Sequence, residues 1–142
     1  MTLTRDDTTR LLAGTRLFAG VTADGLAMIS ARMTEIDLPA GRVIARQGDI
    51  GTGFYVIVSG LVRVVRDGQT LAQLGPGDFF GELSVLDGRP RVAQVVSVEP
   101  TTCLALASWD FEAVVAEQPS LALAIMRELA GRLRELTEAT SH

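Results

Sequence analysis

The spacing of hydrophobic residues changes twice along the chain. In residues 1–33 the apolar positions recur at intervals of three and four, which predicts a helical segment. Its clearest part runs from Leu26 to Met33 behind Thr22, whose hydroxyl is suited to cap a helix. From Glu35 to about Leu106 the pattern becomes short apolar runs separated by glycine, proline or aspartate. Such regular punctuation is typical of an antiparallel sandwich or barrel.

The β region predicts roughly eight strands, because turn residues interrupt it at regular distances. The clearest strands are Phe54–Val58, Leu61–Val65, Ala93–Val98 and Thr101–Leu106. Between them, Asp67-Gly68 is the strongest hairpin turn, since both residue types tolerate the positive φ of a tight hairpin. We therefore expect a mainly β fold with flanking helices. Its centre is a roughly eight-stranded antiparallel β-roll of jelly-roll or barrel type, between an N-terminal helical segment and C-terminal helices.

The last part of the chain returns to a helical pattern. Ser108 is expected to cap one helix, which breaks at Pro119. In the next helix the apolar residues alternate steps of four and three, the spacing of a coiled-coil seam. They are Ala122, Met126, Leu129, Leu133 and Leu136. Two interpretations stay open, because the stripe is shorter than a usual coiled coil: it packs on its own β region, or it forms a homodimer.

Composition excludes several kinds of chemistry. All 13 basic residues are arginine, so there is no lysine for a Walker-type phosphate site or a Schiff base. The sole histidine is His142 at the chain end, and the sole cysteine is Cys103. These counts argue against a Ser/His or Cys/His catalytic pair, a disulfide or a tetrahedral zinc site. We expect no enzyme, no catalytic residue, no metal and no cofactor.

Charge and hydropathy narrow the choice of partners. The net charge of -4 argues against a nucleic-acid partner, which normally requires a basic surface. The longest uninterrupted apolar run, Leu121–Met126, is too short to span a membrane, and no basic segment followed by an apolar stretch opens the chain. We expect no signal peptide, no membrane span and a cytoplasmic location. At 142 residues, a single domain is the default.

One segment inside the β region, residues 78–93, does not have the pattern of a strand. Glu82–Leu86 can form one short helical turn with Gly81 ahead of it, and a glycine there allows a ligand to approach the backbone. Free N–H groups at the start of the turn would bind an anion. They belong to Glu82, Leu83 and Ser84. After the loop, Pro90 directs Arg91 back toward the same place, and the fork of an arginine suits a phosphate.

This segment resembles the phosphate-binding cassette of the cyclic-nucleotide-binding domain family. The family includes the sensor domain of the bacterial catabolite activator and the regulatory subunits of protein kinase A. Its pattern, Phe-Gly-Glu-Leu-Ser followed after a short loop by Pro-Arg-x-Ala, is met by Phe80–Ser84 and Pro90–Ala93. The similarity covers most of the chain, from Leu17-Phe18 through Gly77-Asp78 to the closing helices. Two half-motifs at this separation are far more specific than a lone Gly-Glu pair.

The resemblance implies that two parts of the chain have different roles. Residues 1–118 would form a helical lead-in plus the β-roll with a short cassette helix, and residues 119–142 a C-terminal lid or dimerisation helix of the same domain. Arg91 would pair with the phosphate of a cyclic nucleotide, and Glu82 would accept a hydrogen bond from its ribose 2′-hydroxyl. Supporting backbone N–H groups would lie near Leu83, Ser84 and Val92.

The base of the ligand is the least specified part of the site. Val62 and Leu71, apolar residues of the β region, are candidates to flank it, and the resemblance places Leu136 and Thr137 where the last helix reaches it. Family members that bind cGMP tend to have threonine at the position of Val92, which offers no hydroxyl here. We therefore interpret the chain as a cAMP-responsive regulatory module in which ligand binding repositions the C-terminal helix.

Each proposed ligand residue also has a structural explanation. Glu82 would complement the positive end of a helix, Arg91 would pair with Glu82 or Glu99, and the Ser84 side chain would cap. Three other functions stay open: a degenerate module that serves for protein interaction or dimerisation, a sensor of cGMP or another cyclic nucleotide, and a cupin-type β-barrel enzyme. The last is nearly excluded, because it needs histidine ligands. No direct DNA binding is expected, since few residues follow Pro119.

Overall fold

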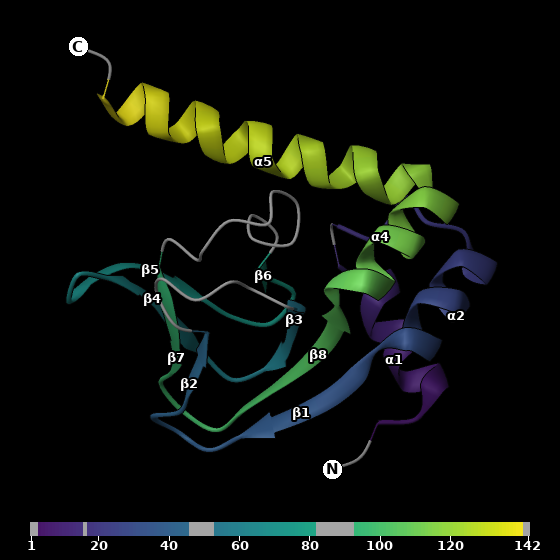
Figure 1. Cartoon of the computed structure of the whole chain (residues 1–142), viewed down its shortest axis with the longest axis horizontal. Helices are drawn as coiled ribbons and strands as arrows, with labels where there is room; N and C mark the ends of the chain where they lie inside the picture. The colour runs from purple at the N-terminus through teal and green to yellow at the C-terminus, as the bar shows by residue number, and fades with distance from the viewer. Residues whose placement is uncertain (1–2, 16, 46–52, 82–92, 141–142) are drawn as a thin grey trace.

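The computed structural model describes residues 3–15, 17–45, 53–81 and 93–140. Its helices are α1 (Arg5–Ala13), α2 (Ala23–Arg32), α4 (Ser108–Glu117) and α5 (Pro119–Thr140). Its strands are β1 (Thr34–Leu38), β2 (Val43–Ala45), β3 (Gly53–Ser59), β4 (Val62–Arg66), β5 (Gln69–Leu74), β6 (Phe79–Phe80), β7 (Gln94–Ser97) and β8 (Thr101–Ala107). In Figure 1 the strands gather at one end, α1, α2 and α4 at the other, and α5 runs along one side past both groups.

The strands form two four-stranded antiparallel sheets, in the orders β1-β8-β3-β6 and β2-β7-β4-β5. The predicted mainly β fold, with antiparallel strands and flanking helices, is confirmed. A closed barrel is not what the described strands form. The outer strands of each sheet pair on one side only. The apolar side chains between the two open sheets are buried without the sheets closing into a barrel. The predicted cassette helix falls in residues 82–92, outside the described residues.

Strand β3 separates two apolar cores. Alternate residues of a strand point to opposite faces, so Phe54 and Val56 pack toward the helices while Ile57 packs between the sheets. The core between the sheets consists of Ile57, Val62, Phe80, Val95 and Cys103. The helix-side core includes Leu12, Leu26, Ile29, Phe54, Val56, Phe79, Leu104, Leu106, Phe111, Val114, Leu121 and Ile125. One face of the β1-β8-β3-β6 sheet is thus covered by helices and the other by the second sheet.

Threonine hydroxyls fix the starts of the first two helices. The Thr4 hydroxyl accepts a hydrogen bond from the Asp7 N–H at 3.0 Å, and the Asp7 carboxylate accepts one from the Thr4 N–H at 3.1 Å. The bond from the Thr4 backbone, followed by that from its side chain, lowers the pKa of Asp7 below its usual value. Thr22 caps α2 as predicted, because its hydroxyl accepts from the Gly25 N–H at 3.1 Å.

The two C-terminal helices follow β8 directly. The predicted cap of α4 is wrong: Ser108 is the first residue of the helix, and Ala107 occupies the cap position without a side-chain hydrogen bond. The strand runs straight into the helix there, so its last residue takes the position that a capping side chain would need. The predicted break at Pro119 is confirmed, since α4 ends at Glu117 and Pro119, which has no N–H to leave unpaired, begins α5.

Two tight turns contain residues with positive φ. The predicted hairpin at Asp67-Gly68 joins β4 and β5, and φ is 51° at Asp67 and 82° at Gly68, the left-handed pair that such hairpins require. The turn from β3 to β4 contains Gly60, with φ of 98°. A Cβ atom on Gly60 would lie 2.5 Å from the Thr101 hydroxyl oxygen and 2.6 Å from the Pro100 carbonyl oxygen.

We expect Gly60→Ala to lower the free energy of unfolding by about 2 kcal/mol or more, because the left-handed backbone and the steric overlap both oppose a side chain. The matched control is Gly68→Ala. It has a similar positive φ but nothing within 4 Å of the new Cβ, so only the backbone strain of about 1 kcal/mol applies. Urea denaturation compares the two variants, and equal losses would contradict a steric contribution at Gly60.

Candidate functional site

The predicted ligand-binding segment begins at the end of β6, a strand of two residues. Phe79 pairs with Val56 of β3, and Phe80 pairs with Tyr55. Neighbouring residues of a strand face opposite sides, so Phe79 enters the helix-side core and Phe80 the core between the sheets. The Phe80 ring stacks on Tyr55, with centroids 4.9 Å apart and planes inclined by 14°. This short strand is therefore held from both faces.

A hydrogen-bonded turn fixes the approach to β6. The Asp78 carboxylate accepts from the Gly75 N–H at 2.9 Å, and the Asp78 carbonyl accepts from the Ile57 N–H at 2.9 Å. The Gly77 N–H donates to the Ile57 carbonyl at 2.8 Å, which extends the pairing with β3. Directly after the strand, Gly81 has φ of 94°, a conformation that favours glycine. The structure thus places a left-handed glycine where the sequence predicts close approach of a ligand.

Most of the predicted ligand residues lie outside the described residues. They are Glu82, Leu83, Ser84, Arg91 and Val92. The described residues on either side of them belong to different sheets: Gly81 follows β6, and Ala93 precedes Gln94 of β7, which pairs with Val65 of β4. The segment therefore connects an edge strand of one sheet to an inner strand of the other. The roles of its residues stay predictions.

The four residues predicted near the base differ in burial. Val62 is fully buried between the sheets. Leu71 is 57% exposed on the edge strand β5, and Leu136 is 66% exposed on α5. Thr137 is also exposed, and its hydroxyl donates to the Leu133 carbonyl at 2.9 Å. Val62 thus belongs to a closed core while the other three are open to solvent, and a role of any of them at the base stays a prediction.

A contact that sequence reasoning missed lies between α5 and β6. The central guanidinium carbon of Arg132 is 4.6 Å from the centroid of the Phe79 ring, within the range of a cation–π interaction. Leu121 and Ile125, on the same face of α5, are buried in the helix-side core. The sequence carried no signal for this contact, because helical periodicity shows which residues share a face and not which strand that face meets.

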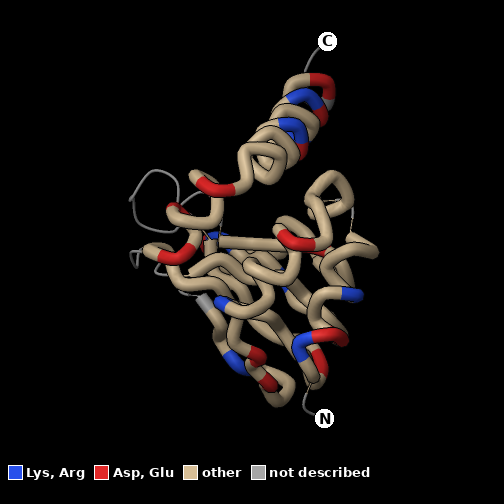
Figure 2. The backbone as a smooth tube through the Cα atoms, turned by 90° about the vertical axis from the view of Figure 1, so that its right-hand side faces the viewer, with Lys and Arg blue, Asp and Glu red and all other residues tan. Residues whose placement is uncertain are grey.

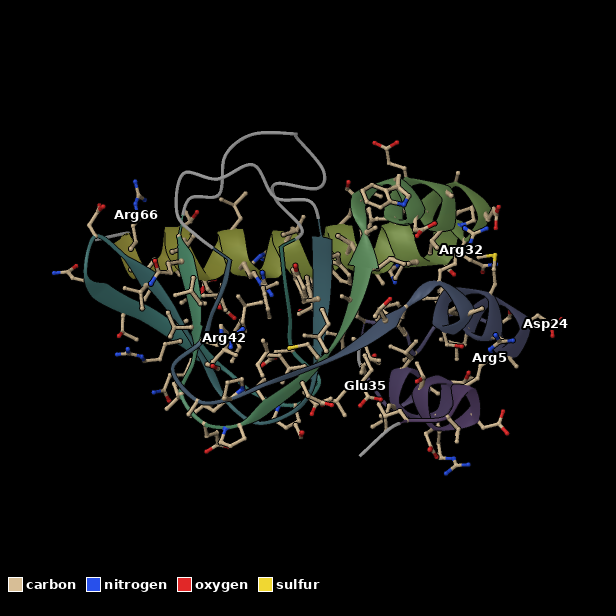
Figure 3. The ribbon with its side chains drawn as sticks, turned by 60° about the horizontal axis from the view of Figure 1, so that its bottom comes forward. Arg5, Asp24, Arg32, Glu35, Arg42 and Arg66 are labelled. Carbon is tan, nitrogen blue, oxygen red and sulfur yellow. The ribbon has the colours of Figure 1, made fainter. Side chains whose placement is uncertain are left out.

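The arginines labelled in Figure 3 and one cavity lie outside the predicted ligand segment. In Figure 3, Arg5 lies on α1, Arg66 on β4 and Arg42 in the connection before β2, while Arg32 lies near α4 with its Nη2 3.7 Å from the Glu117 carboxylate. A cavity of about 290 Å³ lies between α1 and the turn before β6. Its lining is mainly apolar and contains none of the predicted ligand residues. It consists of Arg10, Leu11, Leu12, Gly14, Thr15, Val56, Ile57, Val58, Pro76 and Gly77.

Neither a metal centre nor a transmembrane helix is found in the part of the chain that the structure describes. There, histidine, cysteine, aspartate and glutamate side chains form no group of three that could hold a metal ion. None of the helices there is both long and apolar enough to cross a membrane. The buried Cys103 lies between the sheets, and its burial raises the pKa of the thiol to about 11.

The family of the chain follows from comparison with known proteins. The profile described as cyclic nucleotide-binding domain matches residues 35–118, which run from β1 to the end of α4 and include both half-motifs of the cassette. The chain belongs to this family. The resemblance seen in the sequence is thereby confirmed.

Several relatives of this cyclic nucleotide-binding domain are regulators. It is 40% identical over 129 residues to the cyclic AMP receptor protein of Thermus thermophilus, covering 87% of this chain and 60% of that protein. The crystal structure of the T. thermophilus catabolite activator protein matches with a TM-score of 0.82 and 38% identity, over 88% of this chain and 61% of that chain. The regulatory domain of Toxoplasma gondii protein kinase A, solved with cAMP, matches with a TM-score of 0.71 and 31% identity, over 78% and 44%.

The chain spans about 60% of the length of the cyclic AMP receptor protein that it matches. The family profile falls on both sheets and on α4, and the relatives named above include a cyclic AMP receptor protein and the regulatory domain of a protein kinase. The chain is therefore a cyclic nucleotide-binding regulatory domain.

We expect the thiol of Cys103 to resist alkylation by iodoacetamide at pH 8, because the thiolate is the reactive form and burial raises the pKa of this group to about 11. The same reaction in urea, where the chain is unfolded, is the control and should go to completion. Mass spectrometry measures both. Rapid modification of the folded protein would contradict a closed core between the sheets.

Proposed function

We propose that this domain binds cAMP at its cassette and transmits the bound state through α5. The observation that carries the proposal is the left-handed Gly81, directly after a strand held from both faces, at the head of the family motif. A glycine in this conformation leaves room for a ligand beside the following backbone N–H groups. The names of two relatives, a cyclic AMP receptor protein and a kinase regulatory domain solved with cAMP, agree with this ligand.

Each ligand group has a proposed partner in the segment after Gly81. The guanidinium of Arg91 pairs with the phosphate, and N–H groups near Leu83, Ser84 and Val92 donate to its oxygens. The Glu82 carboxylate accepts a hydrogen bond from the ribose 2′-hydroxyl. A nucleotide without a cyclic phosphate carries more charge and a different phosphate geometry, so the site should discriminate against 5′-AMP.

The preference for cAMP over cGMP in this proposal depends on a single side chain. Val92 has no hydroxyl, so it cannot form the hydrogen bond to guanine that a threonine at this position would offer. Val62, Leu71, Leu136 and Thr137 remain candidates for contacts with the base. We propose that the chain has no catalytic activity and makes no direct contact with DNA. We also propose that it lies in the cytoplasm.

The exposed part of α5 supports a role in self-association. Leu123 is 45%, Met126 58%, Leu133 65% and Leu136 66% exposed. Figure 2 shows acidic and basic residues alternating along the last turns of the same helix, as on the flanks of a coiled-coil seam. Of the seam predicted from the sequence, Ala122 and Leu129 are partly buried, and Leu129 packs on the helix-side core. We therefore propose that a second copy of the chain packs against Met126, Leu133 and Leu136.

The ligand proposal is tested by calorimetric titration of the full chain with cAMP, cGMP and 5′-AMP. We expect cAMP to bind most tightly. Glu82→Ala should weaken cAMP binding about ten- to a hundredfold, the worth of a hydrogen bond to a charged group. Arg91→Ala should weaken it more, because the phosphate charge would stay desolvated without a partner.

Arg89→Ala is the matched control for these variants, since it removes a charge from the same loop but not a predicted ligand contact. Its affinity for cAMP should equal that of the unmodified chain. Binding that ignores the substitution of Arg91 would overturn the proposed site. Absence of binding to all three nucleotides would instead favour a degenerate module that only mediates interaction.

We expect the chain to form a dimer that Leu133→Gln dissociates, because a polar amide would replace an apolar side chain in the seam. Arg134→Gln changes the neighbouring exposed residue to the same amide and should leave the dimer intact. Sedimentation velocity at micromolar concentration measures both variants. A monomeric unmodified chain, or equal behaviour of the two variants, would contradict a seam on this face.

A further inference from the structure

The cavity beside α1 has an apolar floor and a charged rim. It measures about 290 Å³ and is lined by the end of α1, by β3 and by the turn before β6. At its floor Leu12 of α1 and Val56 of β3 are buried. At its rim Leu11 is 37% exposed, and the side chain of Arg10 is 79% exposed. The cavity therefore offers apolar surface inside and a positive charge where it meets solvent.

Polar groups that line the cavity are already hydrogen-bonded within the domain. The Gly77 N–H donates to the Ile57 carbonyl at 2.8 Å. The Thr15 hydroxyl donates to the Leu12 carbonyl at 2.7 Å and accepts from the Phe18 N–H at 3.3 Å. A ligand that needs hydrogen bonds at these positions would have to break existing ones, which costs free energy. The lining thus favours an apolar ligand group over a polar one.

Arg10 is the charged residue of the lining. Its Nη1 lies 3.9 Å from the Asp7 carboxylate, which is longer than a hydrogen bond. The other Asp7 oxygen accepts from the Thr4 N–H at 3.1 Å, as part of the cap of α1. The Arg10 side chain faces solvent, and its planar fork of N–H donors matches a carboxylate. The loose pair with Asp7 leaves this fork able to bind a second carboxylate.

We propose that the cavity beside α1 binds a monoanion with an apolar chain, of the medium-chain carboxylate class. The chain lies on Leu12 and Val56, and the carboxylate meets Arg10 at the rim. An apolar cavity of about 150 Å³ already holds benzene, so the volume here has room for several methylene groups. Arg10 disfavours a cationic head group and gives a neutral one no charge attraction. The site is separate from the cassette and does not depend on the function proposed above.

Octanoate is the probe for this site, and 1-octanol and octylamine carry the same chain with a neutral and a cationic head group. Each is titrated into the full chain labelled with ¹⁵N, and amide shifts are followed by NMR. We expect octanoate to shift the amides of Leu12, Val56 and Gly77 with a dissociation constant of about 1 mM. Octanol should bind about two- to fivefold more weakly, the worth of an exposed ion pair, and octylamine more weakly still.

Two variants test the floor and the rim separately. Val58 lines the cavity and packs against the helix-side core, so Val58→Phe fills part of the volume and should weaken octanoate at least about tenfold. Arg10→Gln should bring octanoate to the affinity of octanol and leave octanol unchanged. Arg5→Gln is the matched control, because it removes an exposed arginine of the same helix that does not line the cavity, and it should match the unmodified chain.

Three results would overturn the inference. They are amide shifts that spare Leu12, Val56 and Gly77, equal affinity for octanoate and octanol, and equal affinity of Arg10→Gln and Arg5→Gln for octanoate. If Val58→Phe does not fold, the comparison of the two arginine variants decides, since both substitutions lie on exposed residues. None of these results changes the affinity expected for cAMP, so this inference and the proposed function fail independently.

Discussion

The two phenylalanines of β6 point to opposite faces of the strand, and the position of the cassette depends on this alternation. Phe80 is fixed between the sheets on Tyr55, and Phe79 is fixed in the helix-side core with Phe54. Two residues provide little backbone pairing, so apolar burial of the two rings, about 1.5 to 3 kcal/mol each, must supply much of what holds the strand. The cassette therefore starts from a fixed point, although β6 is an edge strand.

Local chemistry made the elements of the fold predictable. The hairpin at Asp67-Gly68 and the cap at Thr22 follow from single residues whose backbone and hydroxyl preferences act within a few positions. Relations between distant parts were not predictable in this way. Turn spacing counts strands but does not tell whether the outer strands meet, so it left a sandwich and a closed barrel both open, and the structure has two open sheets. Ser108 has the chemistry of a cap, but the direct passage of β8 into α4 places Ala107 there instead.

In the candidate site, too, local features were predictable and contacts between distant residues were not. The motif around Gly81 could be read from the sequence, because the residue types and their separation are themselves the signal. The contact of Arg132 with Phe79 could not, since it depends on where α5 crosses the sheet. The apolar stripe predicted on α5 shows the same limit. Heptad spacing identifies an apolar face, but Leu129 belongs to the edge that packs on the domain, whereas Met126 and Leu133 face outward.

In the proposed function, one short strand supports both the phosphate site and the helix that responds to it. The most direct measurement is a crystal structure of the full chain grown with saturating cAMP. We expect the phosphate within hydrogen-bond distance of the Arg91 guanidinium, the ribose 2′-hydroxyl on the Glu82 carboxylate, and Arg132 over the ring of Phe79. A nucleotide bound elsewhere, such as in the cavity beside α1, or crystals without bound nucleotide at saturating concentration, would contradict it.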